Sequence, residues 1–263
     1  MKYVIVTGAF GGMGYAAVKA LKNKGYFIFA LDRAVGDAAE NVMPIQADLT
    51  KAEDITAAYE KIRSVTDNVY AIVHFAGMYN LDSLVEMSEE SFTRIFDVNV
   101  FSVYRVNKAF LPLLKNGSRI VITTSELAPL DPLPFTGIYA ITKSALDKYA
   151  YSLRMELQLL GISVAVLRPG AVDTGMLGAS ISALDRFCDN TELYTFSAKR
   201  FKSIVESVEA KSVKSDKIGK ITVKILGRKR PKFIYKINRN PLLLLLNLLP
   251  KRLATFIIKM ILK

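Results

Sequence analysis

A doubly wound α/β fold around a parallel sheet is predicted by three features of the sequence. Runs rich in Val, Ile and Phe alternate with longer segments whose apolar residues recur at helical spacing. Several of these runs are apolar throughout, which is typical of strands buried on both faces. The first run ends in a glycine-rich turn that leads directly into a helical segment. Strict alternation of strands and helices predicts right-handed crossovers and helices on both faces of the sheet.

The elements can be assigned in order along the chain. The run YVIVTG at 3–8 predicts the first strand, and 12–24 predicts a helix that stops at Gly25. Thr50 is a candidate N-cap for a helix that extends through Ile62. Further strands are expected at 26–32, 42–50, 69–77, 118–125 and 162–170, and further helices at 89–115, after an N-cap at Ser88, and at 136–160.

The composition excludes several kinds of site. Among 263 residues there are one cysteine, Cys188, and one histidine, His74. A single cysteine allows no intrachain disulfide and fits a reducing, cytoplasmic location. These residues are too few for a zinc or iron–sulfur site, so no metal is expected, and a Ser/His triad is not favoured. His74 lies in an apolar strand and is expected to be buried and hydrogen-bonded. The start KYVIVTGAF predicts no signal peptide.

The turn TGAFGGMG after the first strand has the chemistry of a phosphate site. Gly8, Gly12 and Gly14 lie between strand and helix. Glycines allow a tight turn and the close approach of a pyrophosphate, while the helix N-terminus supplies free amides and a favourable dipole. Its position between a strand and a helix therefore predicts a dinucleotide site.

Asp32 ends the second predicted strand, 18 residues after Gly14. A carboxylate there can accept hydrogen bonds from both adenosine ribose hydroxyls and repel a 2′-phosphate, which favours NAD. Arg33 follows directly and could instead favour the phosphate of NADP. We weigh Asp32 more heavily and expect NAD, with NADP as the alternative.

The stretch IYAITKSA at 138–145 places Tyr139 and Lys143 four residues apart in a predicted helix. Residues at i and i+4 share one helical face. An ammonium beside a phenol favours the phenolate, so the pKa of Tyr139 is expected to fall towards neutrality, as acid–base catalysis requires. From this stretch alone, a surface tyrosine packed on a lysine stem is the alternative.

Taken in order, these motifs resemble those of the short-chain dehydrogenase/reductase family over residues 2 to about 175. The glycine motif matches Thr7 to Gly14, and the family's YxxxK motif matches Tyr139 and Lys143. Other matching positions are Asp48 and Leu49 after the third strand, Asn99 in DVNV, Ser125 in ITTSE and the turn RPGAVDT at 168–174. The layout is similar to the hydroxysteroid and retinol dehydrogenase branch. The resemblance implies one Rossmann-like catalytic domain over 1–263 that is a homodimer or homotetramer.

The resemblance also implies roles for individual residues. Tyr139 would act as general acid or base on the alcohol oxygen, and Lys143 would lower its pKa and bind the nicotinamide ribose. Ser125 would hold the substrate oxygen, and Asn99 would connect Lys143 to solvent through a water. Cofactor contacts are implied for Gly8, Gly12, Met13, Gly14, Asp32, Arg33, Asp48, Leu49, Ala76, Gly77, Tyr139, Lys143, Pro169, Gly170, Val172 and Thr174. The expected reaction interconverts a secondary alcohol and a ketone.

Two positions depart from the family pattern. Phe75, before Ala76 and Gly77, replaces an asparagine that braces the central sheet. Ser125 lies 14 residues before Tyr139, one more than the family spacing, so Thr124 is the alternative for the serine role.

Residues 175–215 are expected to form a mobile helical lid over an apolar substrate. Leu127, Leu133 and Phe135 are further candidates for the pocket above the catalytic tyrosine. No Arg/Lys cluster suits a sugar phosphate, so a steroid, bile acid, retinoid or other lipophilic alcohol is preferred. The lid's large apolar residues either face the substrate or pack on the core: Met176, Leu177, Ile181, Leu184, Phe187, Tyr194, Phe196 and Phe201.

The C-terminal part of the chain is strongly basic. Residues 199–263 contain 18 Lys and Arg against 3 Asp and Glu, whereas residues 1–198 contain 18 against 21. The extension 228–263 has apolar runs that are interrupted at 250–252 and are shorter than the roughly 20 residues of a membrane span. Two amphipathic helices are expected, which contact a membrane peripherally, cover the substrate entrance or form a dimer interface. Nucleic acid is not an expected partner, because no recognition module is present.

Three functions remain open on the sequence. The preferred one is an NAD-dependent dehydrogenase for a lipophilic alcohol. The second is an NADPH-dependent 3-oxoacyl-thioester reductase, whose basic tail would bind an acidic carrier protein. The third is a non-enzymatic dinucleotide sensor, which would not need a tuned phenol.

Overall fold

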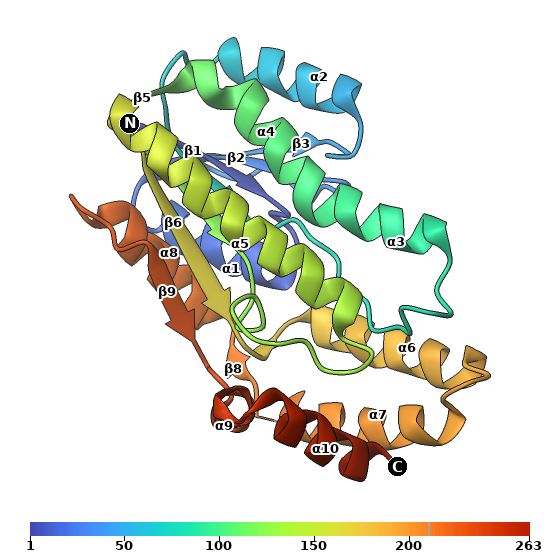
Figure 1. Ribbon diagram of the computed structural model, residues 1–263. Coiled ribbons are helices and arrows are strands. Elements are labelled where there is room, and N and C mark those ends of the chain that lie inside the picture. Colours follow the sequence, from blue (N-terminus) through green and yellow to red (C-terminus); the bar gives the residue numbers. More distant parts are fainter. Residues whose placement is uncertain (210) are drawn as a thin grey trace.

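The computed structural model describes the chain except residue 210 and the side chains of residues 175–181 and 209. At its centre is a seven-stranded sheet in the order β3-β2-β1-β4-β5-β6-β9, in which all neighbouring strands run parallel (Figure 1). The strands are β1 (Lys2–Thr7), β2 (Tyr26–Asp32), β3 (Val42–Gln46), β4 (Val69–His74), β5 (Leu114–Thr123), β6 (Ser163–Pro169) and β9 (Ile234–Ile237). The predicted doubly wound α/β fold is confirmed.

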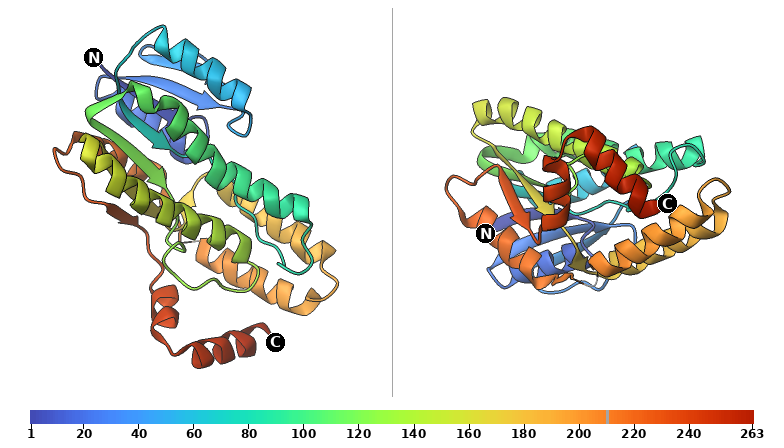
Figure 2. Two further views of the ribbon diagram at one scale, coloured as in Figure 1. Left: turned by 45° about the horizontal axis from the view of Figure 1, so that its top comes forward. Right: turned by 60° about the horizontal axis from the view of Figure 1, so that its bottom comes forward.

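Helices cover both faces of this sheet (Figures 1 and 2). On one face, α1 (Gly12–Lys22) and α8 (Asp216–Gly227) share a core with Val4 and Val6 of β1. On the other face, Ile5 joins a core with the second set of helices. These are α2 (Ala52–Arg63), α4 (Ser102–Phe110) and α5 (Gly137–Leu157). Alternate residues of β1 thus enter two different cores, which explains why the run is apolar throughout.

The helix expected over 89–115 is divided by an irregular turn. It consists of α3 (Glu89–Phe96), a five-residue π-helix (Asp97–Phe101, the π-turn below), α4, and a 3₁₀ helix at Leu111–Leu113. The Oγ of Ser88 accepts a 3.2 Å hydrogen bond from the Ser91 amide, so the predicted N-cap is confirmed.

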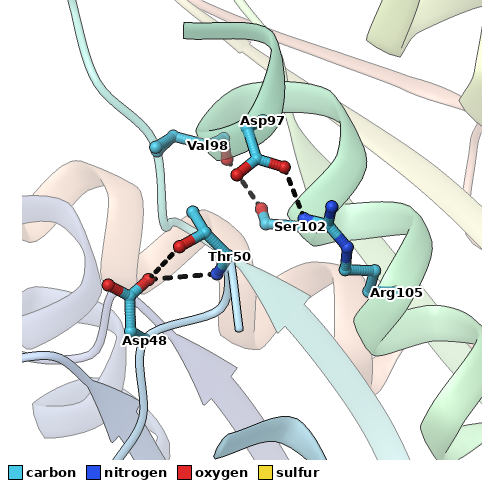
Figure 3. Close-up of polar contacts among 6 residues, drawn as sticks. All are labelled: Asp48, Thr50, Asp97, Val98, Ser102 and Arg105. Atoms are coloured by element: carbon cyan, nitrogen blue, oxygen red, sulfur yellow. Dashed lines mark hydrogen bonds and ion pairs between the residues drawn. The ribbon is translucent and has the colours of Figure 1, made fainter. Parts of the chain in front are cut away.

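Side-chain contacts brace the π-turn on both sides (Figure 3). The Ser102 amide donates to the Asp97 carbonyl, five residues back, as a π-helix requires. The Ser102 hydroxyl donates to the Val98 carbonyl at 2.6 Å, and Arg105 pairs with the Asp97 carboxylate at 2.6 Å. The Ser102 hydroxyl thus supplies a donor to a backbone carbonyl of the π-turn, and the ion pair ties its first residue to α4.

Thr50 does not cap α2 as expected, because Lys51 holds the N-cap position. The Thr50 hydroxyl donates instead to Asp48 Oδ1 at 2.7 Å (Figure 3). Short polar side chains often bond nearby backbone or side-chain groups in this way when a strand turns into a helix.

The chain after β6 builds the region beyond the carboxyl edge of the sheet (Figure 1). The expected lid consists of α6 (Gly175–Asn190) and α7 (Thr195–Glu209), with β7 (Val172–Asp173) and β8 (Val213–Lys214) pairing at its base. After β9, the chain ends in α9 (Pro241–Leu248) and α10 (Lys251–Leu262). Across the described residues, no helix combines the length and apolarity needed to cross a bilayer.

Candidate active site

The glycine-rich turn joins β1 to α1 by unusually close backbone contacts. Gly8 has φ of +63°, and a Cβ there would lie 2.5 Å from the Ala76 nitrogen. A Cβ on Gly14 would lie 1.9 Å from the Gly8 carbonyl oxygen, and one on Gly12 would lie 2.5 Å from Thr174 Cβ. No described side chain caps α1, whose N-cap residue is Gly11. Its first amides therefore remain available to a phosphate.

Gly14→Ala is expected to lower the free energy of unfolding by roughly 2–4 kcal/mol, because the new methyl group overlaps backbone that cannot move aside. Dinucleotide binding should fall with it. Gly227→Ala is the matched control, because a Cβ there meets nothing within 4 Å. Urea denaturation of both variants checks this, and equal stability of the two would contradict the packing argument.

Asp32, the last residue of β2, and Asp48, which follows β3, both accept hydrogen bonds from backbone amides. Asp32 Oδ2 accepts from the Phe10 amide at 2.9 Å, so Asp32 fixes the glycine-rich turn, and Oδ1 accepts from the Arg33 amide at 2.8 Å. Burial raises the pKa of Asp48, but hydrogen bonds from Thr50 outweigh it and hold that pKa below its ordinary value. Arg33 is exposed, while Leu49 lies in the core.

Tyr139, Ser125 and Lys143 meet at the carboxyl end of the sheet. Ser125 follows β5 and hydrogen-bonds the Tyr139 hydroxyl. The Lys143 ammonium lies 5.6 Å from the centre of the Tyr139 ring and donates to the Thr123 carbonyl at 3.4 Å. The Thr124 hydroxyl donates instead to Asp147 at 3.3 Å, so it does not take the serine position.

The expected lowering of the Tyr139 pKa is wrong for this structure. Burial raises the pKa of Tyr139 to about 12, and the hydrogen bond from Ser125 opposes this only in part. Burial also lowers the pKa of Lys143 to about 8. Both groups lie in a site that disfavours charge, which their spacing in the sequence does not reveal. At neutral pH, Tyr139 is therefore a phenol with a proton to donate.

Asn99 lies on the π-turn and holds the segment that follows β4. Its Oδ1 accepts from the Met78 amide at 2.8 Å, and its Nδ2 donates to the Met78 carbonyl at 3.0 Å. The same Nδ2 donates to the Thr142 hydroxyl at 3.1 Å. A Cβ on Gly77 would lie 3.2 Å from Asn99 Oδ1 and 3.4 Å from Lys143 Nζ. Asn99 and Lys143 thus meet beside Gly77.

The Phe75 departure is accommodated within the core. Phe75 is buried, and its amide donates to the Thr7 carbonyl at 3.0 Å.

His74, the residue before Phe75, is hydrogen-bonded in the core. Its Nε2 lies 2.8 Å from Asn107 Oδ1, and Asn107 Nδ2 donates to the Tyr149 hydroxyl at 3.1 Å. The prediction of a buried, hydrogen-bonded histidine is confirmed.

Burial lowers the pKa of His74 to about 4, from an ordinary value of 6.5. The folded protein thus binds fewer protons than the unfolded chain between these pH values. Its stability should fall by about 3 kcal/mol as the pH drops from 6.5 to 4, in addition to any carboxylate contribution. Because His74 is the sole histidine, an NMR titration of its imidazole checks the pKa directly, and an ordinary value near 6.5 would contradict this account.

The turn after β6 completes the site and reveals a residue that the sequence did not indicate. Gly170 lies so close to the C-terminal segment that a Cβ would be 2.0 Å from the Asn238 carbonyl and 2.6 Å from Glu126 Oε1. Glu126 Oε2 accepts from the Asn240 amide at 2.7 Å, just before α9. Burial raises the pKa of Glu126, although the bond from Asn240 opposes it. Only the tertiary fold brings these distant residues together.

An apolar pocket opens above Tyr139, between the sheet edge and the lid. The predicted site residues that line it are Met13, Gly77, Ser125, Tyr139, Lys143, Pro169, Gly170, Val172 and Thr174. Apolar side chains form most of the remaining wall, namely Phe75, Met78, Tyr79, Leu127, Leu133, Phe201, Ile204, Val205, Val208 and Leu243. Of the other predicted positions, Gly8, Asp32 and Asp48 lie outside this pocket, at the carboxyl ends of β1, β2 and β3, and Ala76 and Asn99 are also outside its lining.

The apolar lid residues have two different roles. Leu184 and Phe187 are buried with Phe135, whose ring centre is 4.6 Å from that of Phe187, so they pack the lid on the body of the protein. Phe201 belongs to this cluster and also lines the pocket, whereas Phe196 is exposed. The predictions for Met176, Leu177 and Ile181 fall on side chains outside the described residues.

The residues present fit a dinucleotide. The glycines leave the amides of α1 open, and carboxylates stand at the ends of β2 and β3. The buried Thr123 hydroxyl lines the pocket and has no hydrogen-bond partner among the described residues, so it can meet a polar group there. The described residues contain no group of three His, Cys, Asp or Glu side chains that could hold a metal.

Comparisons with known proteins agree with this geometry. Residues 2–184 match the family model for short chain dehydrogenase. Estradiol 17-beta-dehydrogenase 2 of Mus musculus is 33% identical over 192 residues, which are 68% of this chain and 50% of that protein. The 3-ketodihydrosphingosine reductase of Bacteroides thetaiotaomicron is 27% identical over 236 residues, 89% of this chain and 87% of that protein. The alignment thus spans half of the mouse relative but most of the bacterial one.

Solved structures show the same fold. A short chain dehydrogenase family protein from Francisella tularensis has a TM-score of 0.74 and 26% identity, covering 90% of this chain and 96% of that one. The 3-ketoacyl-(acyl-carrier-protein) reductase from Brucella melitensis, complexed with NADH, has a TM-score of 0.73 and 21% identity, with coverage of 90% and 96%. A short chain dehydrogenase from Burkholderia cenocepacia in complex with NADP has a TM-score of 0.72 and 20% identity, with coverage of 98% of each chain. Neighbours with NADH and with NADP both occur, so the fold does not choose between the two.

Proposed function

Because this chain belongs to the short-chain dehydrogenase family, whose members are NAD(P)-dependent oxidoreductases that act on CH–OH groups, we propose that it interconverts a secondary alcohol and a ketone on a lipophilic substrate. One observation carries the proposal. Ser125, Tyr139 and Lys143 meet at the base of a pocket whose wall is mostly apolar. Such a pocket favours a steroid-like or other lipid substrate over a sugar phosphate.

The chain's own residues supply position and the proton. The Ser125 hydroxyl, next to the Tyr139 hydroxyl, holds the substrate oxygen. Tyr139 is protonated at neutral pH, since its pKa is raised to about 12. It gives this proton to the substrate oxygen when a ketone is reduced, and in the reverse reaction the phenolate form takes a proton from the alcohol. The nicotinamide dinucleotide, when bound, supplies the hydride chemistry.

NAD is proposed as the preferred dinucleotide. The Asp32 carboxylate stands at the end of β2 and is fixed by the Phe10 and Arg33 amides. A carboxylate held there opposes the negative charge of a 2′-phosphate. Arg33 is exposed beside it, which is the feature that favours NADP.

A second candidate is the reduction of a ketone on a long-chain lipid. The Bacteroides relative, a 3-ketodihydrosphingosine reductase, aligns over most of both chains. A protonated Tyr139 suits carbonyl reduction at neutral pH. The 3-oxoacyl-thioester reductase is the related alternative, and one structural neighbour bears such a name.

Absorbance at 340 nm with purified protein tests these proposals. The panel contains hydroxysteroids, bile acids, retinoids, a long-chain 3-keto amine and 3-oxoacyl thioesters, each with NAD(H) and NADP(H). Turnover of a sterol-like alcohol or a keto lipid supports a lipophilic substrate. Turnover of thioesters with NADPH alone would overturn both the substrate and the Asp32 argument. Dinucleotide binding without any turnover would favour a sensor.

A further inference from the structure

Helix α9, near the C-terminus, exposes a large apolar surface to solvent. Six of its eight residues are leucine, and none of the eight is buried. Leu242, Leu245 and Leu248 are 67%, 59% and 82% exposed. A helix that is apolar on all sides is normally covered on all sides. The described structure therefore leaves α9 in need of an apolar partner.

The neighbouring helix α10 is apolar on two opposite sides. Ile258 and Leu262 face inward and pack with Phe201 of α7. Leu253, Phe256 and Met260 are exposed. Because their spacing of three and four residues places them on one helical face, α10 has an outward apolar stripe as well. Figures 1 and 2 show α9 and α10 together at one end of the molecule, beyond the sheet.

The chain around these leucines is strongly cationic. Residues 217–263 contain no Asp or Glu. Arg239 precedes α9, Arg252 and Lys259 lie on α10, and Lys263 follows α10. All four residues are exposed. Of the nearby cations, Lys251 alone forms an ion pair that the described residues show, with Asp131.

We propose that the exposed faces of α9 and α10 form a docking surface for an anionic membrane. In this arrangement, Leu242, Leu245 and Leu248 enter the acyl boundary, and the cations around them contact lipid headgroups. A second copy of the chain fits less well, because a two-fold interface would place two cationic rims against each other. Both helices lie in the plane of the interface, since neither is long enough to span a bilayer.

The docking surface adjoins the active-site pocket. Leu243 and Asn240 line that pocket, as do Ile204 and Val208 of the lid. Glu126 fixes the start of α9 to the site through the Asn240 amide. A lipid dissolved in the bilayer would thus meet the pocket without crossing water. This last step rests on the proposed function, whereas membrane docking does not.

Co-sedimentation with vesicles tests the proposal in the absence of substrate. The full chain should bind phosphatidylcholine vesicles that contain phosphatidylglycerol more tightly than vesicles of phosphatidylcholine alone, and salt should weaken binding. The triple variant Leu242→Ser, Leu245→Ser, Leu248→Ser should lose roughly tenfold or more in affinity for the vesicles. The reason is that each leucine side chain that enters the bilayer adds its own apolar contribution to binding. Arg252→Gln and Lys259→Gln should each cost about fivefold, on anionic vesicles only.

Leu159→Ser with Leu160→Ser is the matched control, because these leucines are 83% and 59% exposed. They lie past the end of α5, about 30 Å along the helix axis from its first turn, which carries Tyr139. This variant should bind as the wild type does, and so should Tyr139→Phe, which separates docking from catalysis. Absence of vesicle binding, or equal binding by the triple variant, would overturn the proposal. A dimer in sedimentation velocity that the triple variant dissolves would assign the surface to a second copy instead.

Discussion

Tyr139→Phe is expected to leave a folded protein that binds the dinucleotide but turns over ketone and alcohol substrates about 10²–10⁴-fold more slowly, because the donated proton is lost. The ring stays buried against Tyr79, whose ring centre is 4.5 Å away. Among the described residues, the hydroxyl contact that disappears is the one with Ser125. Loss of that one hydrogen bond should change the free energy of unfolding by about 1 kcal/mol.

Initial rates at 340 nm and dinucleotide fluorescence titration measure the two effects separately. Tyr151→Phe, on the same helix and 54% exposed, is the control and should keep wild-type rates. Retained turnover in Tyr139→Phe would remove this residue from the reaction. Loss of both binding and turnover would indicate a structural role.

Lys143→Met is expected to abolish most turnover while making the protein more stable. Burial lowers the pKa of Lys143 to about 8 from 10.5, so at neutral pH the fold holds a buried ammonium at a cost of up to about 3 kcal/mol. Replacing a poorly paired buried charge with an apolar side chain of similar length removes this cost, so thermal unfolding should shift upwards by a few degrees. Stability that falls together with activity would contradict this explanation.

The pH profile gives a second test of Lys143. The wild-type kcat/KM for ketone reduction should decline as the pH rises through about 8, where the ammonium loses its proton. Below that pH the ammonium stabilises the anion that Tyr139 becomes when it gives up its proton. The step near pH 8 should be absent from the residual activity of Lys143→Met. An unchanged profile would assign the ionisation to another group.

The central strands could be predicted because each enters a core on both faces of the sheet. The edge strand β9 was missed because it has only four residues, of which Ile237 alone is buried. It lies among cations, so the segment RKRPKFIYK indicated a basic extension rather than a strand. Its pairing with β6 depends on long-range hydrogen bonds between strands, such as the register of Val166 with Ile234, which no local pattern reveals.

The candidate site was predicted where its chemistry depends on residue type and spacing. The glycine-rich turn and Ser125 lie at one edge of the sheet because the carboxyl ends of parallel strands share it, and α5 brings Tyr139 and Lys143 to Ser125. The direction of the Tyr139 pKa was missed, because burial depends on surrounding residues such as Tyr79 and not on the distance to Lys143 along the helix. Glu126 was missed because its partner, Asn240, lies 114 residues away in the chain.

The π-turn separates side chains that regular helical periodicity would place on one face, because Val106 and Phe110 lie 7 and 11 residues after Asn99. An extra residue per turn shifts the helical phase, so side chains after Phe101 are rotated by about 100° relative to a continuous α-helix. Asn99 can therefore face Met78 while Val106 and Phe110 still face the sheet. A chain one residue shorter here would form a smoother helix, yet it would have to turn either the amide or the core residues away from their contacts.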